Sequence, residues 1–155
     1  MDTSAAVEKA MEMAEQGAQV IDLGGESTRP GSDFISEEEE IRRVLPVLEK
    51  LPTDQFIISI DTTKTKVAQL ALEAGAHLIN DVSGGSTELL KAAHACNAGF
   101  ILMHSQGKPK LMQDQPSYMN PVTEIREFFD QKKEQIKDHV LIAVKTFFFF
   151  KHGKS

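Results

Sequence analysis

The chain has 155 residues, of which 41% are hydrophobic and 26% charged, so it is long enough for one globular domain with its own core. Its net charge of −6 argues against nonspecific binding to nucleic acid or to anionic membranes. The lone cysteine, Cys96, excludes an intramolecular disulfide and a cysteine-based zinc cluster, and we expect it to be a small helix residue. Because the sequence shows no secretory signal and no apolar run of ~20 residues, we expect a cytoplasmic protein.

Helical and β-rich patterns alternate along the chain. Apolar residues at helical spacing predict helices, and short apolar runs bounded by glycine or polar residues predict strands. The expected helices cover residues 4–16, 36–51, 64–74, 87–95 and 122–137, and the expected strands cover residues 19–23, 56–60, 76–79 and 99–103. This alternation is typical of right-handed βαβ units with a parallel sheet that is covered on both faces or closed into a barrel.

The second expected helix begins with a dense acidic run. Ser36 and Glu39 form a capping-box pattern, and Glu37 to Glu40 make up the first turn. Such a run can be mistaken for a metal site, but we expect a solvated first turn that the helix dipole favours. Ser4 is a candidate cap of the first helix.

Residues 20–32 read V-I-D-L-G-G-E-S-T-R-P-G-S, a short buried strand that runs into a polar loop. Glycine allows the backbone to approach a ligand closely, and the planar fork of Arg29 suits phosphate oxygens. Ser27 and Thr28 add hydroxyl donors, while Pro30 stiffens the loop. We predict a loop that grips an anion; the alternative is a polar surface loop with a helix-capping role.

Polar residues also follow the other expected strands, at the edge where parallel sheets bind ligands. Asp61 follows the second strand, Asn80 and Asp81 the third, and His104 the fourth. A single carboxylate at a strand end is often a helix cap, but polar groups at successive equivalent positions predict a shared pocket. The open alternatives for His104 are a base or ligand and a positional residue, of which we favour the second.

The residue types at these positions suggest the kind of ligand. A carboxylate beside an amide, as in Asp61 and Asn80, suits a flat nitrogen heterocycle with an amidine-like edge. Met103 offers an apolar surface to such a ring. With Thr28 and Arg29 at the rim, we expect a heterocycle held deep and a phosphate held at the mouth.

The motifs D-L-G-G-E-S-T-R-P-G-S, I-S-I-D-T, N-D-V-S-G-G and L-M-H-S-Q-G-K-P-K-L-M-Q, in this order, resemble those of dihydropteroate synthases. The resemblance covers about residues 4–136. It implies an α/β fold that is part of a (β/α)₈ TIM barrel, with about four to five parallel strands alternating with helices. It also implies a transferase of folate biosynthesis that joins 6-hydroxymethyl-7,8-dihydropterin diphosphate to p-aminobenzoate with Mg²⁺ as cofactor, and a homodimer in the full-length family.

The resemblance assigns roles residue by residue. Asp61 and Asn80 would hydrogen-bond the pterin edge, and Met103 would pack beside the ring. Thr28 and Arg29 would contact the diphosphate, with Arg29 as the catalytic group that stabilises the leaving charge. The resemblance places Pro30 in the p-aminobenzoate and sulfonamide region.

The sequence departs from the family at both ends. The family's first strand, with an N-V-T-P-D-S-F loop that supplies a metal-linked asparagine, is absent, so we assign no metal ligand here. The D-P-G motif expected after the fifth helix is also absent, and Phe147 to Phe150 follow instead. We therefore divide the chain into a partial pterin-binding barrel at 1–137 and a divergent C-terminal tail at 138–155. The phenylalanines are core residues without a partner or, as we favour, sequence foreign to the family.

Such a partial barrel leaves strand edges unpaired, so we expect self-association and impaired activity of the isolated chain. Two other functions remain open. One is a pterin-binding domain of the corrinoid methyltransferase type, which has a similar barrel but no arylamine chemistry. The other is a non-catalytic remnant that keeps the fold and binds no ligand.

Overall fold

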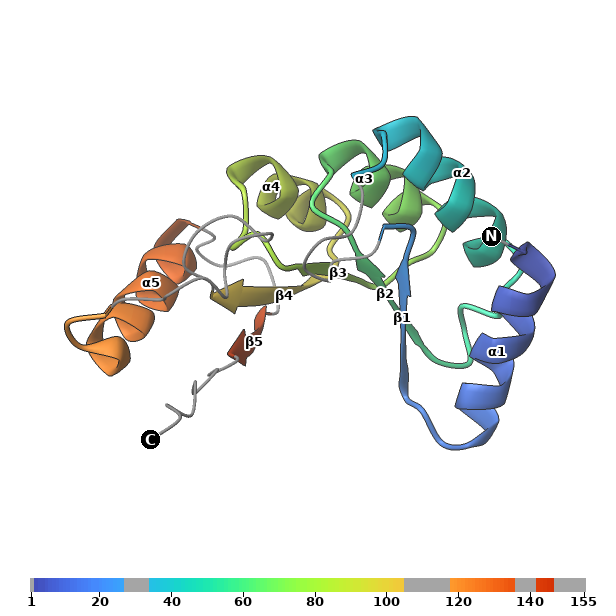
Figure 1. Cartoon of the computed structure of the whole chain (residues 1–155), viewed down its shortest axis with the longest axis horizontal. Coiled ribbons are helices and arrows are strands. Elements are labelled where there is room, and N and C mark those ends of the chain that lie inside the picture. Colours follow the sequence, from blue (N-terminus) through green and yellow to red (C-terminus); the bar gives the residue numbers. More distant parts are fainter. Residues whose placement is uncertain (1, 27–33, 105–117, 136–141, 147–155) are drawn as a thin grey trace, which may run out of the picture.

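The computed structural model describes residues 2–26, 34–104, 118–135 and 142–146, in which helices and strands alternate (Figure 1). The helices are α1 (Thr3–Glu15), α2 (Glu37–Leu48), α3 (Thr65–Glu73), α4 (Thr87–Ala95) and α5 (Pro121–Gln135). The strands are β1 (Val20–Gly24), β2 (Ile57–Asp61), β3 (Leu78–Asp81), β4 (Gly99–His104) and β5 (Ile142–Thr146).

The strands form one parallel sheet in the order β1-β2-β3-β4-β5, so each strand pairs with the next one along the chain. A helix connects each parallel pair, as right-handed crossover connections require. This architecture confirms the predicted α/β fold with four to five parallel strands. The run Phe147 to Phe150 lies outside the described residues.

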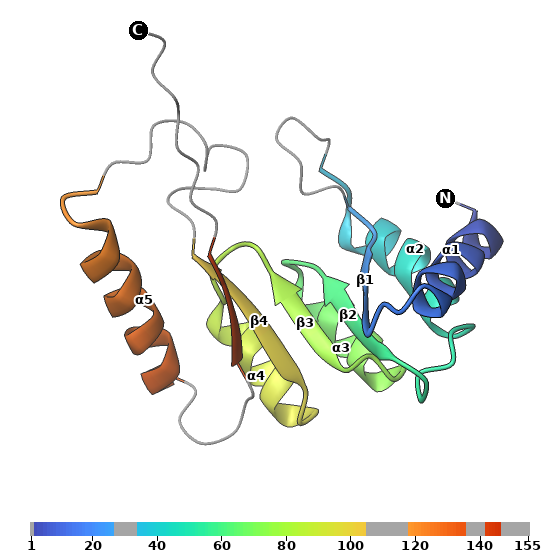
Figure 2. The ribbon, with the colours of Figure 1, turned by 90° about the horizontal axis from the view of Figure 1, so that it is seen from below.

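One face of the sheet carries the core. Ile58, Ile60 and Ile79 are fully buried in a cluster with residues of α2, α3 and α4, such as Leu48, Val67 and Leu89. In Figure 1 these helices lie above the sheet, and Figure 2, seen from below, shows α3 and α4 behind the strands. The opposite face, which we call the open face, has no helix of the described residues across β2 and β3. The side chains of that face on β2 and β3 are therefore not covered by a helix of the described residues.

The ends of several elements differ from the prediction by one to three residues. Asp2, and not Ser4, caps α1, because its carboxylate accepts a hydrogen bond from the Ser4 backbone N–H at 2.9 Å. Ser36 caps α2 as predicted, by accepting from the Glu39 N–H at 3.2 Å. β3 begins two residues later than expected because the Ala76 N–H still bonds the Ala71 carbonyl at the end of α3.

None of the helices in the described ranges is both long and apolar enough to cross a membrane. Cys96 is exposed and is the C-terminal cap residue of α4. It therefore lies directly after a helix, whereas we expected it to be a small residue of a helix.

Candidate functional site

The register of the sheet brings three of the predicted site residues to the open face. Asp61 pairs with Asn80 on the neighbouring strand, and Asn80 pairs with Ile101 on the strand after that. Side chains in register share a face, and alternate residues along a strand return to it. Met103, two residues beyond Ile101, therefore lies on the same face as Asp61 and Asn80. The predicted convergence of strand ends holds for these three residues.

Asn80 is the most constrained polar side chain of this face. It is only 4% exposed, and its Nδ2 donates to Asp22 Oδ2 at 2.9 Å. The other end of the amide, Oδ1, is buried and has no hydrogen-bond partner among the described residues. A buried carbonyl oxygen without a donor is costly, so this atom is suited to accept from a ligand N–H.

Asp61 ends β2 next to Asn80 and is half-buried. Its other neighbour in register is Gly24, at the end of β1. A Cβ on Gly24 would lie 3.5 Å from the Asp61 Cβ, so the glycine keeps the space beside this side chain free of another one. Met103 is 5% exposed and supplies an apolar surface on β4, two residues beyond Ile101, the residue that pairs with Asn80. Together these residues offer an acceptor-rich polar edge beside an apolar surface.

The sequence analysis missed two residues of the open face, Asp22 and Ser59. They pair with each other on β1 and β2, two positions before Gly24 and Asp61. Asp22 is exposed and contacts Asn80, whereas Ser59 is fully buried and its Oγ has no hydrogen-bond partner among the described residues. The available signal was Asp22 itself, a charged residue between the apolar residues Ile21 and Leu23 of an expected strand. We interpreted that strand as an apolar run.

Asp81 belongs to the turn after β3 and not to the open face. It is fully buried, and its carboxylate accepts from the backbone N–H groups of Ser83 at 2.7 Å and Gly85 at 2.8 Å. It pairs with Leu102, which lies in the core, so its side chain is directed to the helix-covered side of the sheet. The carboxylate holds the loop between β3 and α4 in place.

His104, at the end of β4, packs against aromatic side chains. Its ring lies 4.9 Å from the Phe128 ring of α5 in an edge-on arrangement and 6.0 Å from the Tyr118 ring, measured between centroids. Burial lowers the pKa of the His104 imidazole, against a smaller opposing effect from the Glu124 carboxylate. These contacts give His104 a packing role beneath α5.

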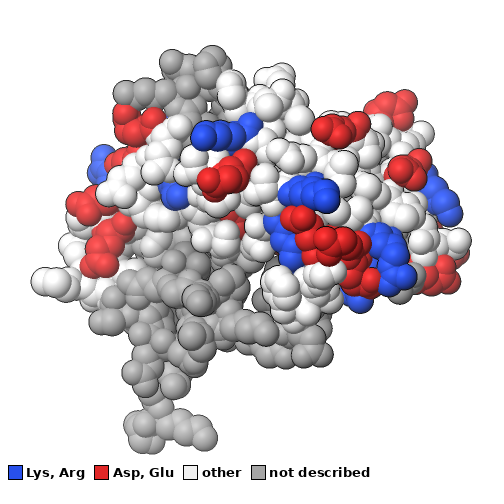
Figure 3. Space-filling model, turned by 90° about the horizontal axis from the view of Figure 1, so that it is seen from above, with Lys and Arg blue, Asp and Glu red and all other residues white. Residues whose placement is uncertain are grey.

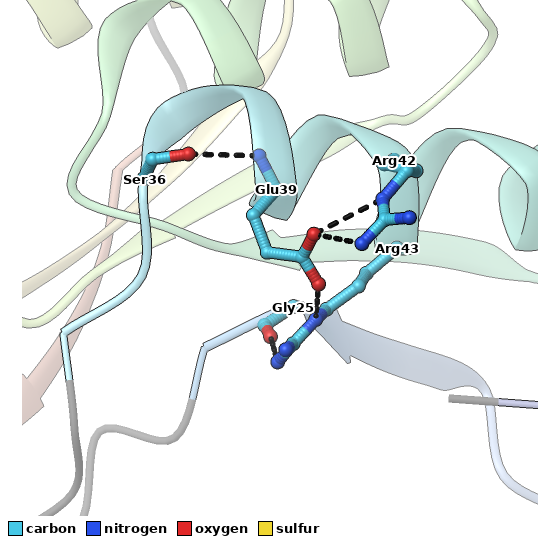
Figure 4. Close-up of polar contacts among 5 residues, drawn as sticks. All are labelled: Gly25, Ser36, Glu39, Arg42 and Arg43. Atoms are coloured by element: carbon cyan, nitrogen blue, oxygen red, sulfur yellow. Dashed lines mark hydrogen bonds and ion pairs between the residues drawn. The ribbon is translucent and has the colours of Figure 1, made fainter.

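Thr28, Arg29 and Pro30 lie outside the described residues, but the backbone just before them is tied to α2 (Figure 4). Arg43 Nη1 donates to the Gly25 carbonyl at 3.0 Å, and Arg43 Nε donates to Glu39 Oε1 at 2.6 Å. Glu39 also binds Arg42, through hydrogen bonds from both Nε and Nη2. Gly25 has no room for a side chain, because an added Cβ would lie 2.8 Å from Glu40 Cγ. Gly25, directly after β1, is therefore held closely against α2.

The acidic run of α2 is only partly the solvated turn that we predicted. Glu40 is 1% exposed, and its carboxylate pairs with the Lys64 ammonium at 2.5 Å, so the prediction is wrong for this residue. A buried carboxylate requires a partner of opposite charge, which a sequence pattern does not reveal. Elsewhere on the helix-covered side, acidic and basic side chains lie next to one another on the surface (Figure 3).

Mg²⁺ is the cofactor that the resemblance implies. No group of three His, Cys, Asp or Glu side chains among the described residues is arranged to hold a metal ion. On the open face, Asp22 and Asp61 are the carboxylates, and Asp22 already accepts from Asn80. Magnesium therefore stays a prediction of the resemblance, and we derive no step through it.

Comparison with known proteins agrees with the motifs. A family model described as "Pterin binding enzyme" matches residues 1–148. Dihydropteroate synthase from Synechocystis sp. is 43% identical over 127 residues, which cover 80% of this chain and 44% of that protein. These matches confirm the resemblance predicted from the sequence.

Solved structures give the same result. The crystal structure of Burkholderia cenocepacia dihydropteroate synthase complexed with 7,8-dihydropteroate has a TM-score of 0.82 at 37% identity and covers 93% of this chain and 54% of that one. The Xanthomonas albilineans enzyme with 4-aminobenzoic acid has a TM-score of 0.79 at 35% identity and covers 92% of this chain and 52% of that one. The sheet is thus part of a TIM barrel, and the chain spans about half the length of these relatives.

Proposed function

This chain belongs to the pterin-binding enzyme family, and we propose that it carries part of a dihydropteroate synthase. The proposed reaction joins 6-hydroxymethyl-7,8-dihydropterin diphosphate to p-aminobenzoate. Two relatives support this reaction, since one solved structure contains 7,8-dihydropteroate, which is the product of such a joining, and another contains 4-aminobenzoic acid, which is one of its substrates. The observation that carries the proposal is the pairing of Asp61 with Asn80 on the open face of the sheet.

The pterin ring would lie against the open face with its nitrogen-rich edge toward these two side chains. The amidine-like edge of a pterin presents N–H donors, which match the Asp61 carboxylate and the buried Asn80 Oδ1. Met103 would contact the flat side of the ring. The Asp22 carboxylate would keep the Asn80 amide in the orientation that exposes Oδ1 to the ligand, because Nδ2 is already bonded to it.

The chemical step is a displacement at the methylene carbon of the pterin. The p-aminobenzoate nitrogen attacks this carbon, the carbon–oxygen bond to diphosphate breaks, and the nitrogen then loses a proton. Diphosphate departs with the electron pair, so a cation beside it lowers the barrier. By resemblance, Arg29 and Thr28 would supply that stabilisation, and Pro30 would border the p-aminobenzoate. Because the chain spans about half of its relatives, we expect the 155-residue chain to turn over substrate poorly or not at all.

Calorimetric titration of the 155-residue chain with 6-hydroxymethyl-7,8-dihydropterin diphosphate tests the proposal. We expect Asp61→Ala to weaken binding by about tenfold or more, because a site built for hydrogen bonds discriminates strongly when one partner is removed. The matched control is Asp54→Ala, an exposed carboxylate in the turn before β2, which should bind as the unmodified chain does.

The outcomes separate the alternatives. Absence of binding to the unmodified chain contradicts the proposal and favours a non-catalytic remnant. Binding of the pterin that p-aminobenzoate and a sulfonamide both leave unaffected favours a pterin-binding domain of the methyltransferase type. Binding that Asp61→Ala weakens about tenfold or more, together with competition between a sulfonamide and p-aminobenzoate, supports the synthase assignment.

A further inference from the structure

Gly24 ends β1 on the open face of the sheet, in register with Asp61 on β2. It lies two residues after Asp22, so the alternation of the strand puts both residues on this face. At the level of Asp61, four neighbouring strands carry a row made of Gly24, Asp61, Asn80 and Ile101 (Figure 2). Gly24 is exposed, and it is the member of this row that has no side chain.

The side chain of Asn80 leads away from Asp61. Its Nδ2 bonds Asp22 Oδ2 at 2.9 Å, and Asp22 is in register with Ser59. Because β2 lies between β1 and β3, this hydrogen bond crosses β2 diagonally, between the levels of Ser59 and Asp61. The bond therefore bounds the site on the Ser59 side of Asp61, whereas Gly24 leaves the β1 side of Asp61 without a side chain.

The fold itself does not require glycine at position 24. A Cβ built on Gly24 would lie 3.5 Å from the Asp61 Cβ and 3.6 Å from the Glu26 carbonyl oxygen, which are ordinary contacts. At the next residue, Gly25, packing against α2 excludes a Cβ. Backbone conformation gives no reason either, because the glycines with positive φ among the described residues are Gly17, Gly75, Gly84 and Gly85. The space over Gly24 is thus compatible with a side chain but is left to whatever binds beside Asp61.

We propose that Gly24 is a specificity-determining residue for the pterin ring, because it leaves room for the flat, donor-bearing edge of the ring beside Asp61. This inference rests on the proposed function, in which that edge binds Asp61 and Asn80. A methyl group at position 24 would occupy the same space and hold the ring away from the carboxylate. Hydrogen bonds of this kind span about 2.7 to 3.2 Å, so a displacement of roughly 1 Å is enough to break one.

The test compares Gly24→Ala with Val20→Ile in the 155-residue chain. The control also adds one methyl group to the open face of β1, but at the other end of the strand, where the Val20 side chain is 42% exposed. Calorimetry is carried out with two ligands, 6-hydroxymethyl-7,8-dihydropterin diphosphate and the same pterin without phosphates. Urea denaturation checks that both variants are folded.

We expect Gly24→Ala to weaken binding of both ligands by the same factor, about tenfold, because the lost contact lies at the ring and not at the phosphates. Val20→Ile should bind both ligands as the unmodified chain does. In a chain that already carries Asp61→Ala, the change at Gly24 should weaken binding less than about twofold, because the hydrogen bond that it obstructs is already gone.

A second readout needs no variant. In the unmodified chain, the Hα resonances of Gly24 should shift when the pterin without phosphates is added, because the ring current of a neighbouring heterocycle changes the field at these protons. The Hα resonances of Gly17, in the turn after α1, should stay where they are. This nuclear magnetic resonance measurement tests directly whether the ring lies over Gly24.

Four results would overturn the role of Gly24. They are unchanged binding of both ligands by Gly24→Ala, weakening of the diphosphate ligand alone, an equal loss with and without the Asp61 carboxylate, and Gly24 resonances that the pterin does not shift. Each leaves the proposed function intact, provided that the unmodified chain binds both ligands and that Asp61→Ala weakens them. If the unmodified chain binds neither ligand, the proposed function fails and the role of Gly24 fails with it.

Discussion

The Asn80 amide on β3 donates to the Asp22 carboxylate on β1, across the strand that lies between them. The two residues are separated by 58 positions in sequence, and the bond measures 2.9 Å. It fixes the orientation of the Asn80 amide, because Nδ2 is engaged and the buried Oδ1 has no hydrogen-bond partner among the described residues. Asp22 is thereby part of the candidate site, although the sequence analysis assigned no role to it as the first residue of the D-L-G-G-E-S-T-R-P-G-S motif.

The first prediction concerns Asp22. Asp22→Ala should weaken binding of the pterin diphosphate by about tenfold, because Asn80 loses the partner that orients its amide. The buried Asn80 Nδ2 also loses its acceptor, so the midpoint of thermal unfolding should fall as well. Calorimetry and thermal denaturation measure the two effects, with Asp130→Ala on the exposed side of α5 as the control. Unchanged affinity would show that Asn80 does not depend on Asp22.

The second prediction concerns the approach of Gly25 to α2. An alanine Cβ at this position would lie 2.8 Å from Glu40 Cγ and 3.0 Å from Val44 Cγ2, so we expect Gly25→Ala to lower the free energy of unfolding by about 1 to 3 kcal/mol. Gly24→Ala is the control, because its nearest contact would be an ordinary 3.5 Å. Urea denaturation of both variants measures the difference. Equal stability of the two variants would contradict the close packing at Gly25.

The third prediction concerns the loop after β3. Asp81→Ala should lower the free energy of unfolding by about 2 to 4 kcal/mol, because the N–H groups of Ser83 and Gly85 lose their buried acceptor. Asp81→Asn keeps one acceptor oxygen and should cost less. Chemical denaturation measures both. Asp54→Ala, at an exposed carboxylate, is the control. If Asp81→Ala lowers the free energy of unfolding no more than this control does, water replaces the carboxylate at this loop.

The fourth prediction concerns pH. In an unfolded chain a histidine has a pKa of about 6.5, whereas burial lowers the pKa of His104 in the folded chain. The unfolded state therefore takes up the proton first as the pH falls, and stability is lost from about pH 6.5 downward until the folded form is also protonated. Unfolding measured between pH 8 and pH 5 should show this loss, and His104→Phe should reduce it. An identical pH profile in the variant would exclude His104 as its source.

The fifth prediction concerns association. In the described sheet, β1 and β5 each have one neighbouring strand, so each presents an edge that can pair with another chain. We expect the 155-residue chain to elute from a size-exclusion column as species larger than a monomer, in proportions that increase with concentration. A monomer at all concentrations that unfolds cooperatively would contradict this expectation.

Much of the fold was predictable from local patterns. The alternation of helical and β-rich runs gave the parallel sheet, because periodicity and chain connectivity together leave few arrangements. Strand ends were less predictable: β2 and β3 extend to Asp61 and Asp81, which the sequence analysis had placed after the strands. Hydrogen bonds to a neighbouring strand determine where a strand ends. The sequence of one strand does not show which strand is its neighbour or how far the pairing extends.

The sequence by itself determined the family and the position of Asp61, Asn80 and Met103 at strand ends, since short motifs and periodicity are properties of contiguous residues. Only the tertiary structure decided that Asp22 orients Asn80, that Asp81 serves a loop, and that Glu40 is buried with Lys64. Each of these facts depends on which side chains the register and the packing bring together, or on the side of the sheet that a residue faces. Residues distant in sequence settle which face of the sheet is covered and whether a charge is buried, which is why the pattern of one segment did not reveal either.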